Sequence, residues 1–216
     1  MEIFNSLSSL LYVLSGVSVI GTGAGSRYRS LKYLYVSAVV MTGVTSAWFH
    51  ADLMYYQQKL DESFETVSVV VLLHWGLAAL EGKQGFARAF YVIILHCIMI
   101  IPAIWWFSEV VCEVHLIGVA LSAAFVLSKA VDRNDDSRLR VAHQLAVVGA
   151  IGGFSLWLVD FFGCKAIIHG VVVPALGFNP QLHAWWHLCT AVSLAAAGFL
   201  VVGLSKKQIV TQQKSE

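Results

Sequence analysis

Seven apolar runs, each long enough to cross a lipid bilayer, occupy most of this 216-residue chain. A helix needs about 20 mostly apolar residues to span the hydrocarbon core. Runs of this length, bounded by charged residues, glycine or proline, predict one transmembrane helix each. They lie near residues 4–23, 33–50, 61–80, 86–107, 111–130, 141–163 and 183–204. The sequence therefore predicts an all-α integral membrane protein, a bundle of seven transmembrane helices.

The composition excludes an ordinary soluble domain. Hydrophobic residues make up 58% of the chain and charged residues 12%, whereas soluble domains carry about 25% charged residues. We expect one domain, the bundle of residues 1–204, and a cytoplasmic tail at 205–216. No Lys or Arg precedes the first run, so we expect it to stay in the membrane. The net charge of +1 gives no basic surface for nucleic acid.

Basic residues fall very unevenly on the two sides of the predicted helices. Only Lys59 and Lys165 lie on one side. The other side carries Arg27, Arg29, Lys32, Lys83, Arg88, Lys129, Arg133, Arg138, Arg140, Lys206, Lys207 and Lys214. Because Lys and Arg concentrate in cytoplasmic loops, we expect a lumenal or outside N-terminus and a cytoplasmic C-terminus. This arrangement requires an odd number of spans.

Residues that are costly at membrane depth gather at the ends of three runs, where they usually mark function. Ser46 and His50 end the second run, one helical turn apart. Asp61 begins the third run. His183 and His187 begin the seventh, again one turn apart, which is the spacing of two histidines that bind one zinc ion.

The predicted topology places all of these residues at one membrane face, and Asp160 joins them from the sixth run. Three neutral imidazoles with an open fourth position are typical of a catalytic zinc site. Asp61 is then the candidate general base, and Ser46 the candidate donor to an oxyanion. We expect the remaining histidines to be interfacial or hydrogen-bonded within the bundle: His74, His96, His115, His143 and His169.

Three segments of the sequence resemble the alkaline ceramidase family. The first is Glu2–Ser8. The second is Ser46–Glu62, which contains Ser-x-x-x-His followed by Asp-Glu. The third is His183–His187, which follows a Trp-x-x-Asp-x-x-x-Cys segment at 157–164. The resemblance implies a seven-helix bundle with a lumenal N-terminus that cleaves ceramide to sphingosine and a fatty acid. It implies that His50, His183 and His187 hold zinc and that Asp61 and Ser46 assist catalysis.

The sequence departs from the family pattern at the calcium site. The family's acidic segment ahead of the first motif supplies most of its calcium ligands, whereas this chain begins Met1-Glu2. Only Glu2 matches a ligand, as a remnant of that site, so the sequence gives calcium dependence little support. The cysteine that would pair with Cys164 is absent with that segment. After Asp61-Glu62 the family continues with Leu-Pro-Met, and Ser63-Phe64-Glu65 stands here.

Three other functions fit parts of the pattern. A related lipid acyl hydrolase would share the Ser, His and Asp positions. A seven-helix receptor could keep the zinc site as structure, and a haem protein would need paired histidines facing each other from two helices. The substrate we expect is a ceramide-like lipid within the membrane, and the sequence indicates no protein partner. We expect the protein in the endoplasmic reticulum or Golgi if the cell is eukaryotic.

The predicted orientation can be tested with an inserted glycosylation acceptor. Placed between Pro174 and Pro180, the acceptor should be modified in a eukaryotic host, because this connection follows the sixth span and faces the lumen. Glycosylation is read as a gel shift that an endoglycosidase reverses. Modification of an acceptor at the C-terminus, with none between the prolines, would contradict the orientation.

Overall fold

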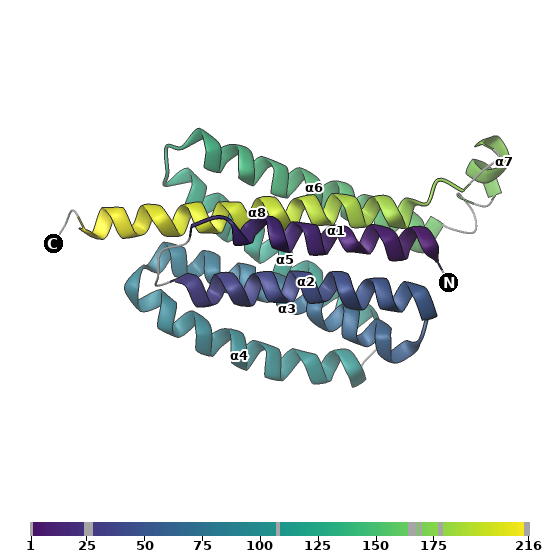
Figure 1. The fold of residues 1–216 in the computed structure, drawn as a ribbon, viewed down its shortest axis with the longest axis horizontal. Helices are drawn as coiled ribbons and strands as arrows, with labels where there is room; N and C mark the ends of the chain where they lie inside the picture. Colours follow the sequence, from purple (N-terminus) through teal and green to yellow (C-terminus); the bar gives the residue numbers. More distant parts are fainter. Residues whose placement is uncertain are drawn as a thin grey trace.

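The computed structural model describes residues 2–23, 28–106, 109–163, 168, 170–176 and 179–213, and nearly all of these residues are helical. Seven long helices form one bundle (Figure 1). They are α1 (Ile3–Ile20), α2 (Arg29–Asp52), α3 (Tyr55–Glu81), α4 (Lys83–Trp106), α5 (Glu109–Asp132), α6 (Ser137–Gly163) and α8 (Leu182–Gln213). All seven are long and apolar enough to cross a membrane, which confirms the predicted number of spans.

Two elements depart from the expected boundaries. A short helix, α7 (Val173–Leu176), lies within the connection between the sixth and seventh long helices. The last helix continues to Gln213, and Ser205 is buried within the bundle, where its hydroxyl accepts a hydrogen bond of 3.0 Å from Trp75 Nε1. Cys164 and His169 lie outside the described residues.

Helix α3 begins at Tyr55, six positions before the start predicted from hydropathy. Hydropathy predicts a loop in the polar stretch before Asp61, but a tight turn joins α2 to α3 instead. Leu53 has a left-handed backbone with φ of 57°, and the Gln57 side chain accepts a 3.2 Å hydrogen bond from the backbone N–H of Met54. Asp61 is therefore held inside the second turn of a helix rather than at its end.

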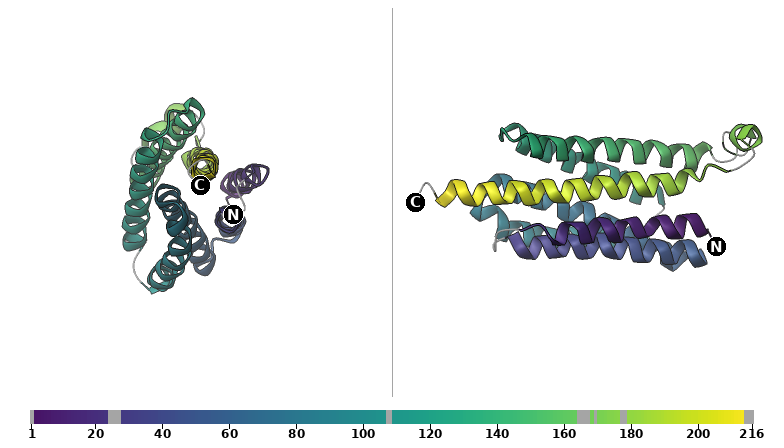
Figure 2. Two further views of the ribbon diagram at one scale, coloured as in Figure 1. Left: turned by 90° about the vertical axis from the view of Figure 1, so that its left-hand side faces the viewer. Right: turned by 45° about the horizontal axis from the view of Figure 1, so that its top comes forward.

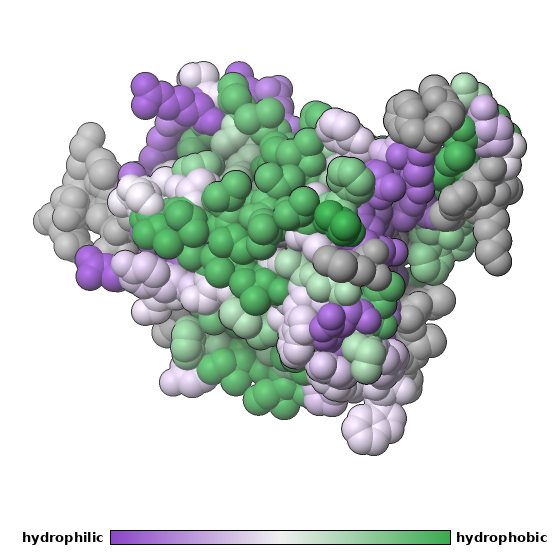
Figure 3. All heavy atoms as spheres, turned by 45° about the vertical axis from the view of Figure 1, so that its right-hand side comes forward, coloured by the Kyte–Doolittle hydropathy of each residue, from purple (hydrophilic) through white to green (hydrophobic). Residues whose placement is uncertain are grey.

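The helices pack around α3, which contacts α2, α4, α5 and α8. Helix α1 lies between α2 and α8, and α6 packs along α8 (Figure 2). The N-terminus, the end of α2 and the beginnings of α3 and α8 lie at one end of the bundle, and the C-terminus lies at the other (Figure 1). A broad apolar band covers the surface between two more hydrophilic ends (Figure 3), as a membrane-spanning bundle requires.

Helices α1 and α2 approach closely at Gly43. A Cβ atom added there would lie 2.9 Å from the backbone nitrogen of Val13 and 3.0 Å from the carbonyl oxygen of Ser9. Small residues permit such close approach of membrane helices. At the end of this contact, the backbone N–H of Glu2 donates to the carbonyl of His50 at 2.8 Å, so the start of α1 is fixed beside the end of α2.

Candidate metal centre

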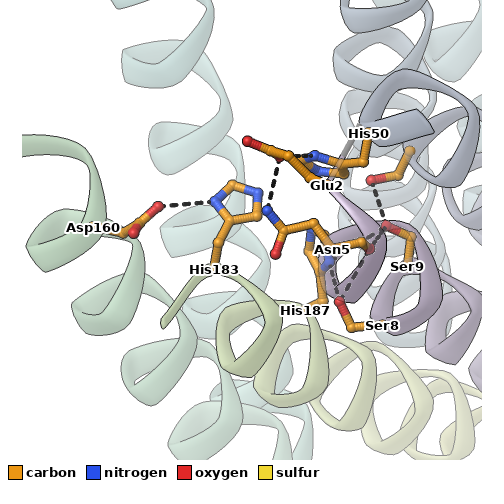
Figure 4. Close-up of polar contacts among 9 residues, drawn as sticks. Glu2, Asn5, Ser8, Ser9, His50, Asp160, His183 and His187 are labelled. Carbon is orange, nitrogen blue, oxygen red and sulfur yellow. Dashed lines mark hydrogen bonds and ion pairs between the residues drawn. The ribbon is translucent and has the colours of Figure 1, made fainter. Parts of the chain in front are cut away.

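Three histidines converge where α2 ends and α8 begins. His50 comes from the last turn of α2, and His183 and His187 from the first two turns of α8. One ligand nitrogen from each lies within 4.8 Å of the others. The ring centroids are 4.8 to 5.2 Å apart, and the side chains face one another (Figure 4). Among the described residues, these three histidines are the group of potential ligands that could surround one metal ion.

The outer nitrogen of each ring is held by a different partner. Nδ1 of His50 lies 2.7 Å from a Glu2 carboxylate oxygen, and Nδ1 of His183 lies 3.1 Å from a carboxylate oxygen of Asp160. Nδ1 of His187 lies 2.8 Å from the hydroxyl of Ser8. Carboxylate and hydroxyl partners of this kind fix the tautomer and orientation of metal-binding imidazoles.

The Ser8 hydroxyl fixes the tautomer of His187. It donates its hydrogen to the carbonyl of Asn5 at 3.1 Å, so it accepts the hydrogen of His187 Nδ1. Nε2 of His187 is then an unprotonated lone pair. This atom is buried and has no hydrogen-bond partner among the described residues.

The arrangement fits a zinc ion. An unpartnered buried nitrogen costs free energy, and that cost is removed if the lone pair binds a metal. Each histidine binds its partner through Nδ1 and leaves Nε2 for the centre of the group. Neutral imidazoles in a group of three are the donor set of catalytic zinc sites.

Glu2 is partly exposed, but its carboxylate is oriented by two neighbouring side chains. Its carboxylate contacts both His50, at 2.7 Å, and the amide of Asn5, at 2.8 Å. Burial raises the pKa of the Glu2 carboxyl, but the hydrogen bonds from Asn5 and His50 outweigh it and hold that pKa below its usual value. Glu2 is therefore a carboxylate at neutral pH. The sequence suggested Glu2 only as a calcium ligand and did not predict its contact with His50.

Ser46 and Asp61 lie beside the histidines and are connected to them through Ser9. The hydroxyl of Ser9 lies 3.1 Å from that of Ser46 and 3.4 Å from Nδ1 of His187. Ser46 is buried, and Asp61 lies close to its hydroxyl. The five residues singled out in the sequence thus meet at one place.

The sequence analysis missed the polar face of α1. Asn5, Ser8 and Ser9 are spaced three and four residues apart, so they share one face of the helix. That spacing was visible in the sequence, but serines in an apolar helix are ordinarily explained by hydrogen bonds to the preceding turn. Ser8 and Ser9 do bond the Asn5 carbonyl, and they contact His187 as well.

The chain is similar to ceramidases along its whole length. A family model described as Ceramidase matches residues 1–216. A putative alkaline ceramidase, dcd3A, of Dictyostelium discoideum is 27% identical, over 89% of this chain and 76% of the relative. The alkaline ceramidase YPC1 of Saccharomyces cerevisiae is 22% identical, over 96% and 71%. Alkaline ceramidase 3 of Mus musculus is 23% identical, over 88% and 73%.

Loss of the partner of His183 should weaken metal binding without removing a ligand. We expect Asp160→Ala to lower zinc affinity about 10-fold or more, because partners of this kind contribute about 10- to 100-fold. Competition with a fluorescent chelator measures it. The matched control is Asp136→Ala, which removes a carboxylate that pairs with Lys207 at 2.9 Å, remote from the histidines. Equal affinities in the two variants would contradict the assigned role.

Proposed function

Because the chain belongs to the ceramidase family, whose model matches residues 1–216, we propose that it hydrolyses the amide bond of a ceramide-like sphingolipid and releases a sphingoid base and a fatty acid. The resemblance drawn from short motifs is thus confirmed at the level of the family. Three relatives named as alkaline ceramidases or a putative one support the substrate class. The seven long apolar helices suit an enzyme whose substrate is dissolved in the membrane.

His50, His183 and His187 would hold the catalytic zinc ion through Nε2. The observation that carries this assignment is the buried, unpartnered Nε2 of His187, within reach of two further imidazoles. When bound, zinc supplies Lewis acidity toward the scissile carbonyl and the attacking water. Glu2, Asp160 and Ser8 orient the three rings through their Nδ1 atoms.

Asp61 would move the proton. Hydrolysis of an amide needs a base that takes a proton from the attacking water and an acid that delivers one to the leaving nitrogen. A carboxylate that is not needed as a ligand can do both in turn. The position of Asp61 inside α3 and close to Ser46 supports this role, since the helix fixes the place of the carboxylate.

Ser46 would stabilise the oxyanion that forms at the carbonyl oxygen. The Ser46 hydroxyl lies 3.1 Å from that of Ser9, which helps to fix its position beside the histidines. A pre-oriented donor of this type lowers the barrier most where the negative charge develops. The excess of basic residues on the opposite loops favours a site that faces the lumen or the outside, in the endoplasmic reticulum or Golgi if the cell is eukaryotic.

The substrate and the metal can be tested together. We expect the purified protein to carry about one zinc per chain and to release a sphingoid base from ceramides in a panel that also contains glycerolipids and acylated glycolipids. Mass spectrometry identifies the products, and a zinc chelator should abolish them until zinc is restored. Equal zinc content in wild type and His183→Ala would show that the ligand set is wrong. Products formed from glycerolipids alone would show that the substrate is a glycerolipid and not ceramide.

The role of Asp61 predicts a separation of activity from metal content. Asp61→Asn keeps the shape of the side chain but removes the base, so turnover of a ceramide-like amide should fall roughly 100-fold or more. Ser46→Ala should lower the rate on a similar scale. Both variants should keep wild-type zinc content, measured by plasma emission. Retained activity in Asp61→Asn would rule out the base role, and lost zinc would make Asp61 a ligand or an anchor of one.

A further inference from the structure

A second group of histidines lies inside the bundle, formed by three helices that do not contribute ligands to the metal centre. Nε2 of His74, on α3, lies 3.3 Å from Nδ1 of His96, on α4. Nε2 of His96 lies 3.0 Å from Nε2 of His115, on α5. The three rings form a continuous row, with centroids 5.6 and 5.2 Å apart. The sequence predicted that these residues would be interfacial or hydrogen-bonded within the bundle, but not that they would bond one another.

The geometry of the row differs from that of a metal site. His96 uses its two ring nitrogens for two different neighbours, so the row is extended and no single point is shared by all three rings. Among the described residues, the group that can surround one ion is His50, His183 and His187. Each nitrogen pair in the row is at the distance of an N–H···N hydrogen bond, and one of the two nitrogens must therefore carry the proton.

The row lies in the middle of the predicted membrane. His74 lies about two turns before α3 ends at Glu81, which is about 10 Å along the axis. His115 lies about 9 Å beyond the start of α5 at Glu109. Helix α3 ends and α5 begins at opposite faces, because α4 runs between them. Since the hydrocarbon core is about 30 Å thick, the row lies within its most apolar part.

Imidazoles in this position are costly, and chains of ionisable residues at membrane depth are typical of proton pathways. A row of neutral imidazoles has two states of equal composition, with every hydrogen bond pointing toward His115 or toward His74. The outer nitrogen atoms of the row are Nδ1 of His74 and Nδ1 of His115. Neither is among the described buried atoms that lack a hydrogen-bond partner. Each outer Nδ1 atom is therefore either exposed or hydrogen-bonded.

We propose that His74, His96 and His115 form a proton relay within the membrane, separate from the hydrolytic site. A proton that arrives at Nδ1 of His74 releases the proton of His74 Nε2 to Nδ1 of His96. His96 in turn releases its Nε2 proton to Nε2 of His115, and His115 releases its Nδ1 proton at the far end. One proton crosses, each ring remains neutral, and rotation of the rings restores the first state.

Proton flux into vesicles tests the relay. The whole protein is reconstituted in phosphatidylcholine vesicles that contain a pH-sensitive dye, and a potassium gradient with valinomycin drives protons inward. Wild type should acidify the interior faster than protein-free vesicles do. His96→Phe removes both nitrogens, whereas His96→Gln keeps a donor and an acceptor but cannot exchange one for the other. Both variants should reduce the flux to that of protein-free vesicles.

The two variants separate a relay from a structural hydrogen bond. If the row only stabilises the bundle, His96→Phe should lower the thermal unfolding temperature while His96→Gln conducts like wild type, and the proposal is overturned. If His96→Phe does not fold, His96→Gln decides the question alone. The matched control is His143→Gln, at a histidine that bonds Ser128 at 3.0 Å outside the row, and it should retain the flux.

Two further results would overturn the relay. Wild-type vesicles that acidify no faster than protein-free vesicles show that no relay operates. A second metal ion in wild type that His96→Gln lacks, measured by plasma emission in the same preparations, identifies the row as a metal site instead. Neither readout depends on ceramide hydrolysis, so the relay and the proposed hydrolytic function can fail independently.

Discussion

Hydrocarbon cannot form hydrogen bonds, and this constraint shapes the whole molecule. Backbone groups pair within long helices, and many hydroxyl groups bond back to their own helix, as Ser63 does to the Lys59 carbonyl and Ser68 to that of Phe64. Buried cations find partners too: Lys32 donates to the carbonyls of Ile20 and Thr22. Polar groups that have neither a bond to their own helix nor a backbone carbonyl partner gather in clusters. Those clusters are the candidates for functional sites.

The metal centre depends on the position of α1. Helix α1 contributes no histidine, yet Glu2 and Ser8 hold the outer nitrogens of His50 and His187. The close approach at Gly43 and the backbone bond between Glu2 and His50 fix this helix against α2. The third outer partner, Asp160, comes from α6. The three rings are thus oriented by two helices that supply none of the proposed ligands, which links the geometry of the site to the packing of the bundle.

The two histidine groups show that arrangement rather than residue type decides the chemistry. In the metal centre each ring faces outward with Nδ1 toward an oxygen partner and leaves Nε2 for a shared point. In the row, the central ring of His96 bonds a neighbour on either side. The first arrangement concentrates lone pairs, as a cation requires, whereas the second alternates donors and acceptors, as proton transfer requires.

The sequence by itself determined the helical class and the number of long helices, because apolar runs of bilayer length have a single stable conformation in lipid. It also identified His50, His183 and His187, since spacing along a helix decides which side chains share a face. Only the tertiary structure decided the start of α3, the partners from α1 and the row from His74 to His115. These depend on how helices that are distant in sequence are rotated and packed against one another, and neither hydropathy nor the spacing within one helix contains that information.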